Sequence, residues 1–283
     1  MAVRVCGIGD EAAEEVADQV AAHRALGLRA IELRSVGGKR LHELDERGLA
    51  EVAEAVAAAR LSVPVIDTPL GDWSTTIAAD LADDLRVLRA SARAAGEVGC
   101  SRLRVMSYPS DGRPGPEWRA AVIARMVELT AVAEQLGMTL LVENCVGWAG
   151  ADPRRALDLL AEVDNPALRL LFDTGNGLEH GYAALPFLEA VLPHVDHVHV
   201  KDGHRVCGRA VFGLPGSGQA RLAECVGLLV EAGYTGWFSL EPHVALFPHL
   251  GLAEADPARR VQAYADCVHA FRELVAGAPV AAR

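Results

Sequence analysis

The chain has 283 residues, of which 51% are hydrophobic and 23% charged, a balance typical of globular proteins and unlike that of disordered or fibrous chains. A net charge of −11, with no Lys/Arg run longer than two residues, argues against a nucleic-acid partner. The sequence contains no run of about 18 apolar residues, which argues against a membrane span. Its six cysteines are dispersed without a C-x-x-C pair. We therefore expect a cytoplasmic protein with reduced thiols.

Short apolar or β-branched runs recur along the chain, each followed by a polar turn and a stretch with helical spacing of apolar residues. The eight runs are 3–8, 30–35, 62–67, 102–107, 139–144, 168–173, 196–201 and 236–241. Their starts lie roughly 27 to 40 residues apart, the length of a strand, a loop and a helix. This rhythm predicts one domain over 1–283, folded as a closed α/β (β/α)8 TIM barrel with a frayed tail at 276–283. The alternative is an open doubly wound sheet, which the missing G-x-G-x-x-G after the first run argues against.

Two of the expected helices have clear boundary signals. Asp152 can cap a helix that Pro153 opens. An apolar stripe within 222–229 predicts an amphipathic helix, and Gly233 is placed to end it in a left-handed conformation. Both helices fall where a barrel needs one.

The last four expected strands all end in side chains that can bind a metal ion. The end residues are Glu143, Asp173, His199 and Glu241. In a barrel of this kind the carboxyl ends of the strands surround the active site. Three carboxylates meeting there would repel one another, and a divalent cation would remove that repulsion. Mainly oxygen ligands favour Mn²⁺, with Mg²⁺, Co²⁺ or Zn²⁺ as alternatives, and disfavour a closed structural zinc site.

Each of these residues also has an alternative interpretation. A strand-end acid can be the ion-pair partner of Arg34, Lys201 or Arg205. His197 and His199 share one strand face, so spacing alone leaves open which of them binds metal. We choose His199 because it lies nearer the strand end.

Further candidates come from the loops and the earlier strands. Lys201 is one of only two lysines and shares the face of His199, although a salt bridge to Asp202 or to a neighbouring strand-end acid is an equal alternative. The glycine-rich segment 212–219 could bind phosphate through backbone N–H groups or be a flexible loop. Both features lie after the seventh strand.

Aromatic and charged residues near other strand ends could contact a substrate. Trp73 and Trp148 could form an apolar wall beside a sugar or pack within loops. Glu32 and Arg34 share a face and could bind substrate hydroxyls or pair with each other. His243 closely follows Glu241 and is a further substrate-binding candidate.

The series V-E-N at 142–144, F-D-T-G-N at 172–176, H-V-H-V-K-D at 197–202 and S-L-E-P at 239–242 resembles the xylose-isomerase-like barrel superfamily. That group includes sugar and sugar-phosphate isomerases and epimerases, inosose dehydratases and apurinic-site endonucleases. The resemblance implies that Glu143, Asp173, His199 and Glu241 hold one divalent metal ion.

The resemblance also implies roles for individual residues. Glu143 and Glu241 would form the acid/base pair, and Arg205 would sit where related enzymes bind substrate through an arginine. Asn176 departs from the pattern, because many members have a histidine at that position. An asparagine can still bind substrate, but it weakens the case for a multinuclear nuclease site.

The function favoured by these residues is a metal-dependent sugar or sugar-phosphate isomerase or epimerase that transfers a proton through an enediolate. A dehydratase of the inosose type is the alternative, since the first proton transfer would be common to both. An apurinic-site nuclease or a non-catalytic subunit ranks lower, because the chain is acidic and the four ligand positions are filled. We expect a small carbohydrate as the partner and leave a homo-oligomer open.

Overall fold

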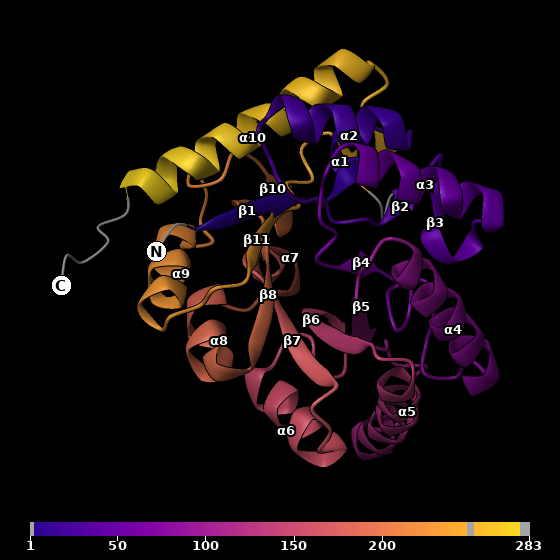
Figure 1. The fold of residues 1–283 in the computed structure, drawn as a ribbon. Helices are drawn as coiled ribbons and strands as arrows, with labels where there is room; N and C mark the ends of the chain where they lie inside the picture. The colour runs from indigo at the N-terminus through magenta and orange to yellow at the C-terminus, as the bar shows by residue number, and fades with distance from the viewer. Residues whose placement is uncertain (1–2, 248–251, 278–283) are drawn as a thin grey trace.

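The computed structural model describes residues 3–247 and 252–277, and its centre is one curled parallel sheet (Figure 1). Seven strands pair in the order β1-β11-β8-β7-β6-β5-β4. They are β1 (Arg4–Gly7), β4 (Ile66–Asp67), β5 (Arg102–Ser107), β6 (Thr139–Gly147), β7 (Leu168–Asp173), β8 (Val195–Val200) and β11 (Trp237–Leu240). Each lies within or overlaps one of the predicted runs.

The sheet closes on itself through the segment between β1 and β4. Single bridges join Ile8 to Glu32 and Leu33 to Ile66, and Glu32 N donates to Gly7 O over 2.8 Å. The predicted regular strand at 30–35 is therefore wrong in detail, because the chain turns away at Ser35 into a hairpin. The predicted barrel is confirmed, and the open sheet is excluded by these closing bridges.

The strand predicted at 62–67 is regular only over its last two residues. Pro64 lies in its middle, and a proline has no N–H to donate to a strand ladder. A bridge between Ala30 and Ser62 keeps the start of the run in the barrel wall. Residues 62–67 therefore still form part of the barrel wall, but they pair with the neighbouring segments less regularly than the other strands do.

The longer helices surround the sheet on its outer side, whereas the short α7 (Asn176–His180) lies inside the ring that these helices form (Figure 1). The other described helices are α1 (Gly9–Ala12), α2 (Val16–Ala25), α3 (Glu46–Ala58), α4 (Leu81–Glu97), α5 (Gly115–Gln135), α6 (Pro153–Val163), α8 (Ala184–Val191), α9 (Leu222–Glu231) and α10 (Pro257–Gly277), with 3-10 turns η1 (Leu41–Glu43) and η2 (Leu192–His194). Residues 278–283 of the predicted frayed tail lie outside the described residues, whereas 276 and 277 end α10.

The boundary signals read from the sequence are confirmed. The Asp152 carboxylate accepts from Arg154 N over 2.9 Å, and Pro153 is the first residue of α6. The predicted stripe is the buried face of α9. Gly233 follows that helix with φ of +81°, a conformation that an L-residue adopts only with strain.

Short pairs of antiparallel strands complete the described part of the fold. These pairs join β2 (Ser35–Val36) with β3 (Lys39–Arg40), β9 (Gly203–Val206) with β10 (Arg209–Phe212), and β12 (Leu246–Phe247) with β13 (Leu252–Ala253). The hairpin of β9 and β10 directly follows β8, so it stands beside the carboxyl ends of the strands. Arg205 lies on this hairpin.

The core is divided between the outside and the inside of the sheet. Side chains facing the helices form one large apolar cluster, which includes Leu140 and Val142 of β6. A small second cluster of Val65, Leu141 and Leu171 lies inside the barrel. Because side chains alternate along a strand, the residues that follow Leu141 and Leu171 on the inner face are those at 143 and 173. The barrel interior is thus apolar at one level and polar at the next.

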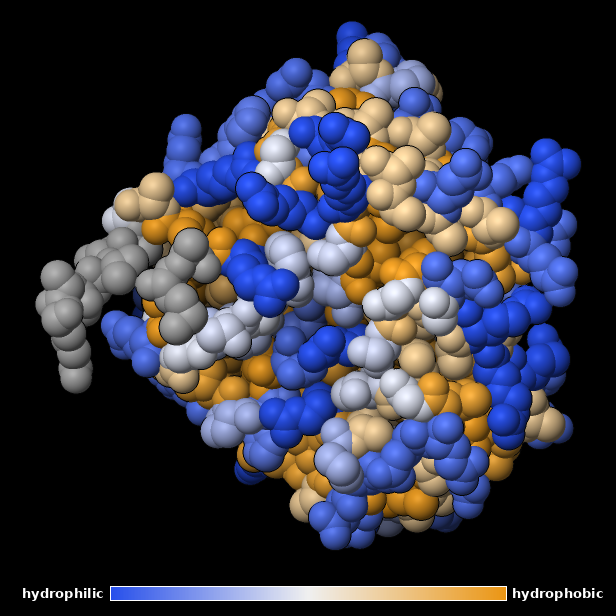
Figure 2. Space-filling model, viewed as in Figure 1, coloured by the Kyte–Doolittle hydropathy of each residue, from blue (hydrophilic) through white to orange (hydrophobic). Residues whose placement is uncertain are grey.

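The surface, the lengths of the helices and the cysteines can also be compared with the expectations from the sequence. Figure 2 shows hydrophilic side chains over much of the face viewed, with apolar areas between them. Within residues 3–247 and 252–277, no helix combines the length and the apolar character needed to cross a membrane. The six cysteines, which all fall in this part of the chain, form no disulfide.

Candidate active site

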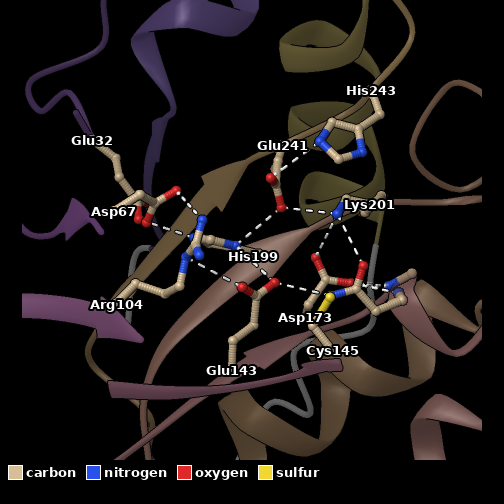
Figure 3. Close-up of polar contacts among 12 residues, drawn as sticks. Glu32, Asp67, Arg104, Glu143, Cys145, Asp173, His199, Lys201, Glu241 and His243 are labelled. Atoms are coloured by element: carbon tan, nitrogen blue, oxygen red, sulfur yellow. Dashed lines mark hydrogen bonds and ion pairs between the residues drawn. The ribbon is translucent and has the colours of Figure 1, made fainter. Parts of the chain in front are cut away.

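Four strand-end residues meet at one point inside the barrel rim (Figure 3). Glu143 lies on β6, Asp173 ends β7, His199 lies on β8 and Glu241 directly follows β11. Each offers one ligand atom, and these atoms all lie within 4.8 Å of one another. A metal ion with bonds of about 2.0 to 2.3 Å places opposite ligand atoms about 4 to 4.6 Å apart. The sequence therefore identified a set of four residues that the fold brings together.

Strand register explains why the four side chains converge. Asp173 pairs with His199 between β7 and β8, and Ser239 of β11 pairs with the same histidine. Two residues after Ser239, Glu241 points to the same side and its N–H bonds to Val200 O over 3.1 Å. Parallel strands thus place these side chains at one level, above the small inner apolar cluster.

The orientation of His199 separates it from His197. His199 Nε2 lies 2.9 Å from Glu32 Oε1, and His197 Nε2 lies 2.8 Å from Glu32 Oε2. A carboxylate only accepts, so Nε2 of His199 carries the hydrogen and Nδ1 faces the cluster, 3.1 Å from Glu241 Oε2. This geometry favours His199 over His197 as the ligand.

The ring of His199 also reflects the negative charge around it. Burial opposes its protonation, but the carboxylates of Glu32 and Glu241 outweigh burial and raise the pKa of His199 well above its ordinary value. A cation bound at Nδ1 would compete with that proton for the same lone pair. The site therefore attracts positive charge at this atom.

Buried polar atoms in the cluster fit a cation. Among the described residues, Asp173 Oδ2, His199 Nδ1 and Glu241 Oε2 are buried and make no hydrogen bond of good geometry. Burial is the main effect that raises the pKa of Asp173 to about 6, against the opposing effect of Lys201. Hard oxygen ligands together with one imidazole suit a divalent ion. The buried atoms without a hydrogen bond and the types of ligand are therefore both compatible with a divalent ion.

Three basic side chains balance the carboxylates. Lys201 Nζ lies 3.2 Å from Asp173 Oδ2 and 2.9 Å from Glu241 Oε2. Arg34 Nη1 lies 2.6 Å from Glu241 Oε1. Arg104 Nε lies 3.3 Å from Glu143 Oε2. These contacts hold the carboxylates in fixed orientations around the centre of the cluster.

Both glutamates remain ionised in this setting. Burial opposes ionisation of Glu241, but Lys201, His243 and His199 lower its pKa well below the ordinary value. Burial likewise opposes ionisation of Glu143, whose pKa is lowered by Arg104 and His199. Each carboxylate is therefore unprotonated at neutral pH, which is the state that a general base requires.

A cavity of about 170 Å³ opens onto the cluster. Its lining residues are Trp73, Arg104, Met106, Glu143, Cys145, Val146, Asn176, Glu179, His180, Lys201, Phe212, Glu241 and His243. The mixture of apolar walls and a few charged groups is typical of a small-molecule site. A small ligand in this cavity would touch the carboxylates directly.

Four of the predicted substrate-binding residues line this cavity. Asn176 donates from Nδ2 to Glu143 Oε1 over 2.9 Å and accepts from Lys201 Nζ over 3.1 Å. Trp73 is 37% exposed at the cavity wall. His243 packs edge-on against Phe212 and lies 3.1 Å from Glu241 Oε1. Direct contact with a substrate stays a prediction for all four.

Glu32 and Arg34 lie behind the cavity rather than on its wall. Glu32 holds both histidines of β8, as described above. Arg34 also pairs with Asp10 and Glu11, over 2.8 and 2.9 Å. The expected pairing of Glu32 with Arg34 does not occur in the described structure, and both residues instead position groups that face the cavity.

Trp148 and Arg205 also lie away from the cavity lining. Trp148 is 5% exposed, with the guanidinium groups of Arg119 and Arg155 each 5.8 Å from its ring. The expectation that Trp148 packs within the protein therefore fits its position better than the expectation that it forms a wall beside a substrate. Arg205 is exposed on β9, where its N–H donates to Gln219 Oε1 over 3.0 Å. Neither residue is among those that line the cavity, and substrate binding stays a prediction for both.

The most important residue that the sequence analysis missed is Arg104. It is 1% exposed, lines the cavity and donates from Nη2 to Asp67 Oδ2 over 3.2 Å. The alternation of Arg102, Leu103, Arg104 and Val105 was a signal that one face of this strand is polar. Lys201 pairs with Asp173 and Glu241, which confirms the expected alternative of a salt bridge to neighbouring strand-end acids.

Solved structures with the same fold include several sugar-converting enzymes. The chain matches an L-ribulose 3-epimerase with a TM-score of 0.75 and 16% identity, covering 100% of this chain and 99% of that one. A D-allulose 3-epimerase from Methylomonas sp. matches with a TM-score of 0.74 and 17% identity, covering 96% of this chain and 98% of that one. At these identities the likeness establishes the fold alone.

A curated protein and a family model also match the sequence of this chain. Inosose dehydratase 1 of Bacillus cereus (strain ZK / E33L) is 29% identical over 146 residues, which cover 46% of this chain and 45% of that protein. The chain thus spans less than half the length of this relative. A model described as a xylose isomerase-like TIM barrel matches residues 20–274. The chain therefore belongs to the xylose isomerase-like TIM barrel family.

Proposed function

We propose that this protein is a divalent-metal-dependent enzyme that transfers a proton at the carbon beside a carbonyl group of a carbohydrate, as an isomerase or epimerase. The observation that carries the proposal is the group of Glu143, Asp173, His199 and Glu241, of which Glu143 and Glu241 line a cavity. Two of these residues are ionised carboxylates that can accept and return protons. Similar enzymes with this fold include epimerases of simple sugars.

The four residues would hold the ion, and Mn²⁺ is the ion we favour. When bound, it would supply positive charge to the oxygen that becomes negative as a proton leaves the neighbouring carbon. The resident acid/base groups are Glu143 and Glu241, whose carboxylates face the cavity. General acid/base transfer of this kind contributes about 10²- to 10⁴-fold to a rate.

The surrounding residues keep the two carboxylates ready for that transfer. Asn176 and Arg104 hold one oxygen each of Glu143, so its direction is fixed from two sides. Lys201 and Arg34 do the same for Glu241. Preorganised partners of this kind lower the cost of reorientation during the reaction.

A dehydratase is the second candidate, and the curated relatives favour it. Loss of water next to a carbonyl begins with the same proton abstraction, so the same residues could serve. Elimination additionally requires a donor for the departing hydroxyl. His243 and Lys201 line the cavity and would be the groups within reach of it.

Solvent deuterium exchange tests the proposed function. Protein stripped with chelator and reloaded with Mn²⁺ is incubated in D2O with ketoses, aldoses and inososes, and label at the carbon beside the carbonyl is measured by NMR. We expect exchange with at least one compound and none above background in the stripped protein. Exchange that is independent of metal, or absent with every compound, would contradict the proposal.

Product analysis and a matched pair of variants sharpen this test. A new epimer or isomer supports the first candidate, whereas loss of water with a conjugated absorbance supports the dehydratase. Glu143→Gln should abolish exchange with the fold intact, and Glu189→Gln, at an exposed position of α8, should retain it. Near-normal exchange in Glu143→Gln would show that the acid/base assignment is wrong.

A further inference from the structure

The ammonium group of Lys201 contacts the same oxygen atoms that a divalent ion would need. Lys201 Nζ lies 2.9 Å from Glu241 Oε2 and 3.2 Å from Asp173 Oδ2 (Figure 3). An ion bonded to Glu241 Oε2 over about 2.1 Å would lie no more than about 5 Å from Nζ. Two positive charges at that separation repel each other. The position of Lys201 therefore opposes binding of an ion.

The other oxygen of each carboxylate is already held by a hydrogen bond. Asp173 Oδ1 accepts from Asn176 N over 2.6 Å, and Glu241 Oε1 accepts from Arg34 Nη1 over 2.6 Å. Within the described part of the chain, Asp173 Oδ2 and Glu241 Oε2 are buried and make no hydrogen bond of good geometry. Lys201 thus balances these two oxygens by charge but leaves their lone pairs open to an ion.

The acid next to Lys201 in the sequence has partners of its own. Both oxygens of Asp202 accept backbone N–H groups over 2.8 to 3.1 Å, and the donors are Gly203, Gly216, Gly218 and Ala220. Converging N–H groups of this kind form an anion-binding nest, and the carboxylate of Asp202 fills it. The prediction that segment 212–219 binds phosphate is therefore wrong for these N–H groups. The charge of Lys201 is balanced by the strand-end acids instead.

The end of the Lys201 side chain also has uncharged partners on the cavity wall. Nζ donates to Asn176 Oδ1 over 3.1 Å and lies 5.6 Å from the centroid of the Phe212 ring. A cation within about 6 Å of an aromatic ring is attracted to its face. All three residues line the cavity. These two contacts would remain available to the ammonium if an ion took over the carboxylates.

The base of the side chain, in contrast, is fixed by close packing. A Cβ added at Gly175 would lie 2.7 Å from Lys201 Cβ and 2.8 Å from its Cγ, so the backbone of Gly175 lies directly against the stem. A lysine carries its charge at the end of a flexible stem. The ammonium can therefore change partners by rotation of the outer bonds while the strand end stays in place.

We infer that Lys201 competes with the divalent ion for Asp173 and Glu241. In protein without the ion, the ammonium balances these two carboxylates. Binding of the ion displaces the ammonium toward Asn176 and Phe212, where it faces the cavity. This inference rests on the proposed function, because it takes the four strand-end residues as the ligands of the ion. Lys201 then lowers the affinity for metal, whereas a residue that supported the ligands would raise it.

Metal affinity in variants of the two lysines tests the inference. Stripped proteins compete with a chromophoric chelator for Mn²⁺ and Co²⁺. Lys201→Met removes the charge at similar length, so we expect its affinity to rise about tenfold or more, the factor that corresponds to about 1.4 kcal/mol. Lys201→Arg keeps the charge and should show no such gain, and the same holds for Lys39→Met at an exposed position. Unchanged or weaker binding by Lys201→Met would overturn the inference.

Thermal unfolding with and without the ion separates competition from a purely structural role. Without the ion, Lys201→Met leaves the carboxylates without their counter-charge, so its Tm should fall below that of the wild type. With saturating Mn²⁺ the ion supplies that charge, and the difference in Tm should shrink or reverse. An equal loss of Tm in both conditions would assign Lys201 a structural role alone and would overturn the inference.

Amine labelling of the wild type decides the inference if Lys201→Met does not fold without the ion. The chain has only two lysines, so mass spectrometry can compare acetylation of Lys201 with that of the exposed Lys39 in one sample. Mn²⁺ should raise the labelling of Lys201 relative to Lys39 severalfold, because the ion takes over the carboxylates and the amine turns toward the cavity. Labelling that stays the same or falls would overturn the inference.

These measurements need no substrate, so the inference and the proposed function can fail separately. Tighter metal binding by Lys201→Met, without deuterium exchange by the wild type on any compound, would support the inference and contradict the proposed function. Exchange by the metal-loaded wild type, with no gain of affinity in Lys201→Met, would do the reverse. If the wild type binds neither Mn²⁺ nor Co²⁺ saturably, both are overturned.

Discussion

The carboxylate of Glu32 is expected to control how strongly His199 binds a metal ion. Glu32 is fully buried and accepts one hydrogen bond from each of two histidines. Through the bond to Nε2 it directs Nδ1 of His199 toward Glu143 and Glu241. A carboxylate in this position also makes the opposite ring nitrogen a stronger donor.

The substitution Glu32→Gln keeps the side-chain volume and removes the charge. A glutamine offers one acceptor oxygen, whereas both histidines now donate to Glu32, so one of the two bonds cannot be kept in its present form. Loss of such a partner typically weakens metal binding 10- to 100-fold. This range corresponds to about 1.4 to 2.8 kcal/mol of binding free energy.

Competition with a chromophoric chelator measures the effect directly. Affinities for Mn²⁺ and Co²⁺ are compared between the wild type and the variant, with unfolding of the stripped proteins followed separately. His197→Gln is the matched control, because its amide can still donate to Glu32 and leaves the bond to His199 in place. The reasoning is refuted if Glu32→Gln binds Co²⁺ within threefold of the wild type, or if His197→Gln weakens binding equally.

Three other predictions concern stability. Asp152→Ala removes the capping bond from Arg154 N, so it should lower the free energy of unfolding by about 1 kcal/mol. A urea titration measures this change, and an unchanged free energy would show that the cap contributes nothing. Burial lowers the pKa of His23 below its ordinary value of 6.5, so the unfolded chain binds a proton there that the folded chain does not. Stability should therefore fall as pH drops below 6.5, more steeply in the wild type than in His23→Gln, and equal slopes would contradict this. Chelator should lower the Tm and excess Mn²⁺ should restore it, since an ion at 100 times its Kd adds about 2.7 kcal/mol, and a Tm that does not respond would argue against the metal site.

Local sequence patterns were sufficient to predict most of the barrel and the four ligand candidates. The runs at 102–107 and 168–173 coincide with β5 and β7, because their apolar alternation and flanking turns are local properties. Glu143, Asp173, His199 and Glu241 could be predicted to meet because parallel strands in a barrel end at one rim. The irregular wall at 30–35 was not predictable in detail, since its bridges depend on both neighbouring segments.

Packing between distant segments decided the details of the site. Arg102 and Arg104 look alike in sequence, but Arg102 stays partly exposed with Asp196 while Arg104 is buried with Asp67 and Glu143. A guanidinium can be buried only where acids from other strands compensate for its lost hydration.

The sequence by itself determined which residues stand at the ends of the strands and which reaction chemistry they can support. Only the tertiary structure decided that His199 and not His197 faces the cluster, because that depends on Glu32 from across the barrel. It likewise decided that the glycine-rich loop is occupied by Asp202, since an anion nest can be filled by any acid that the fold brings to it. Strand periodicity acts over a few residues, whereas charge compensation acts between residues that are close only after folding.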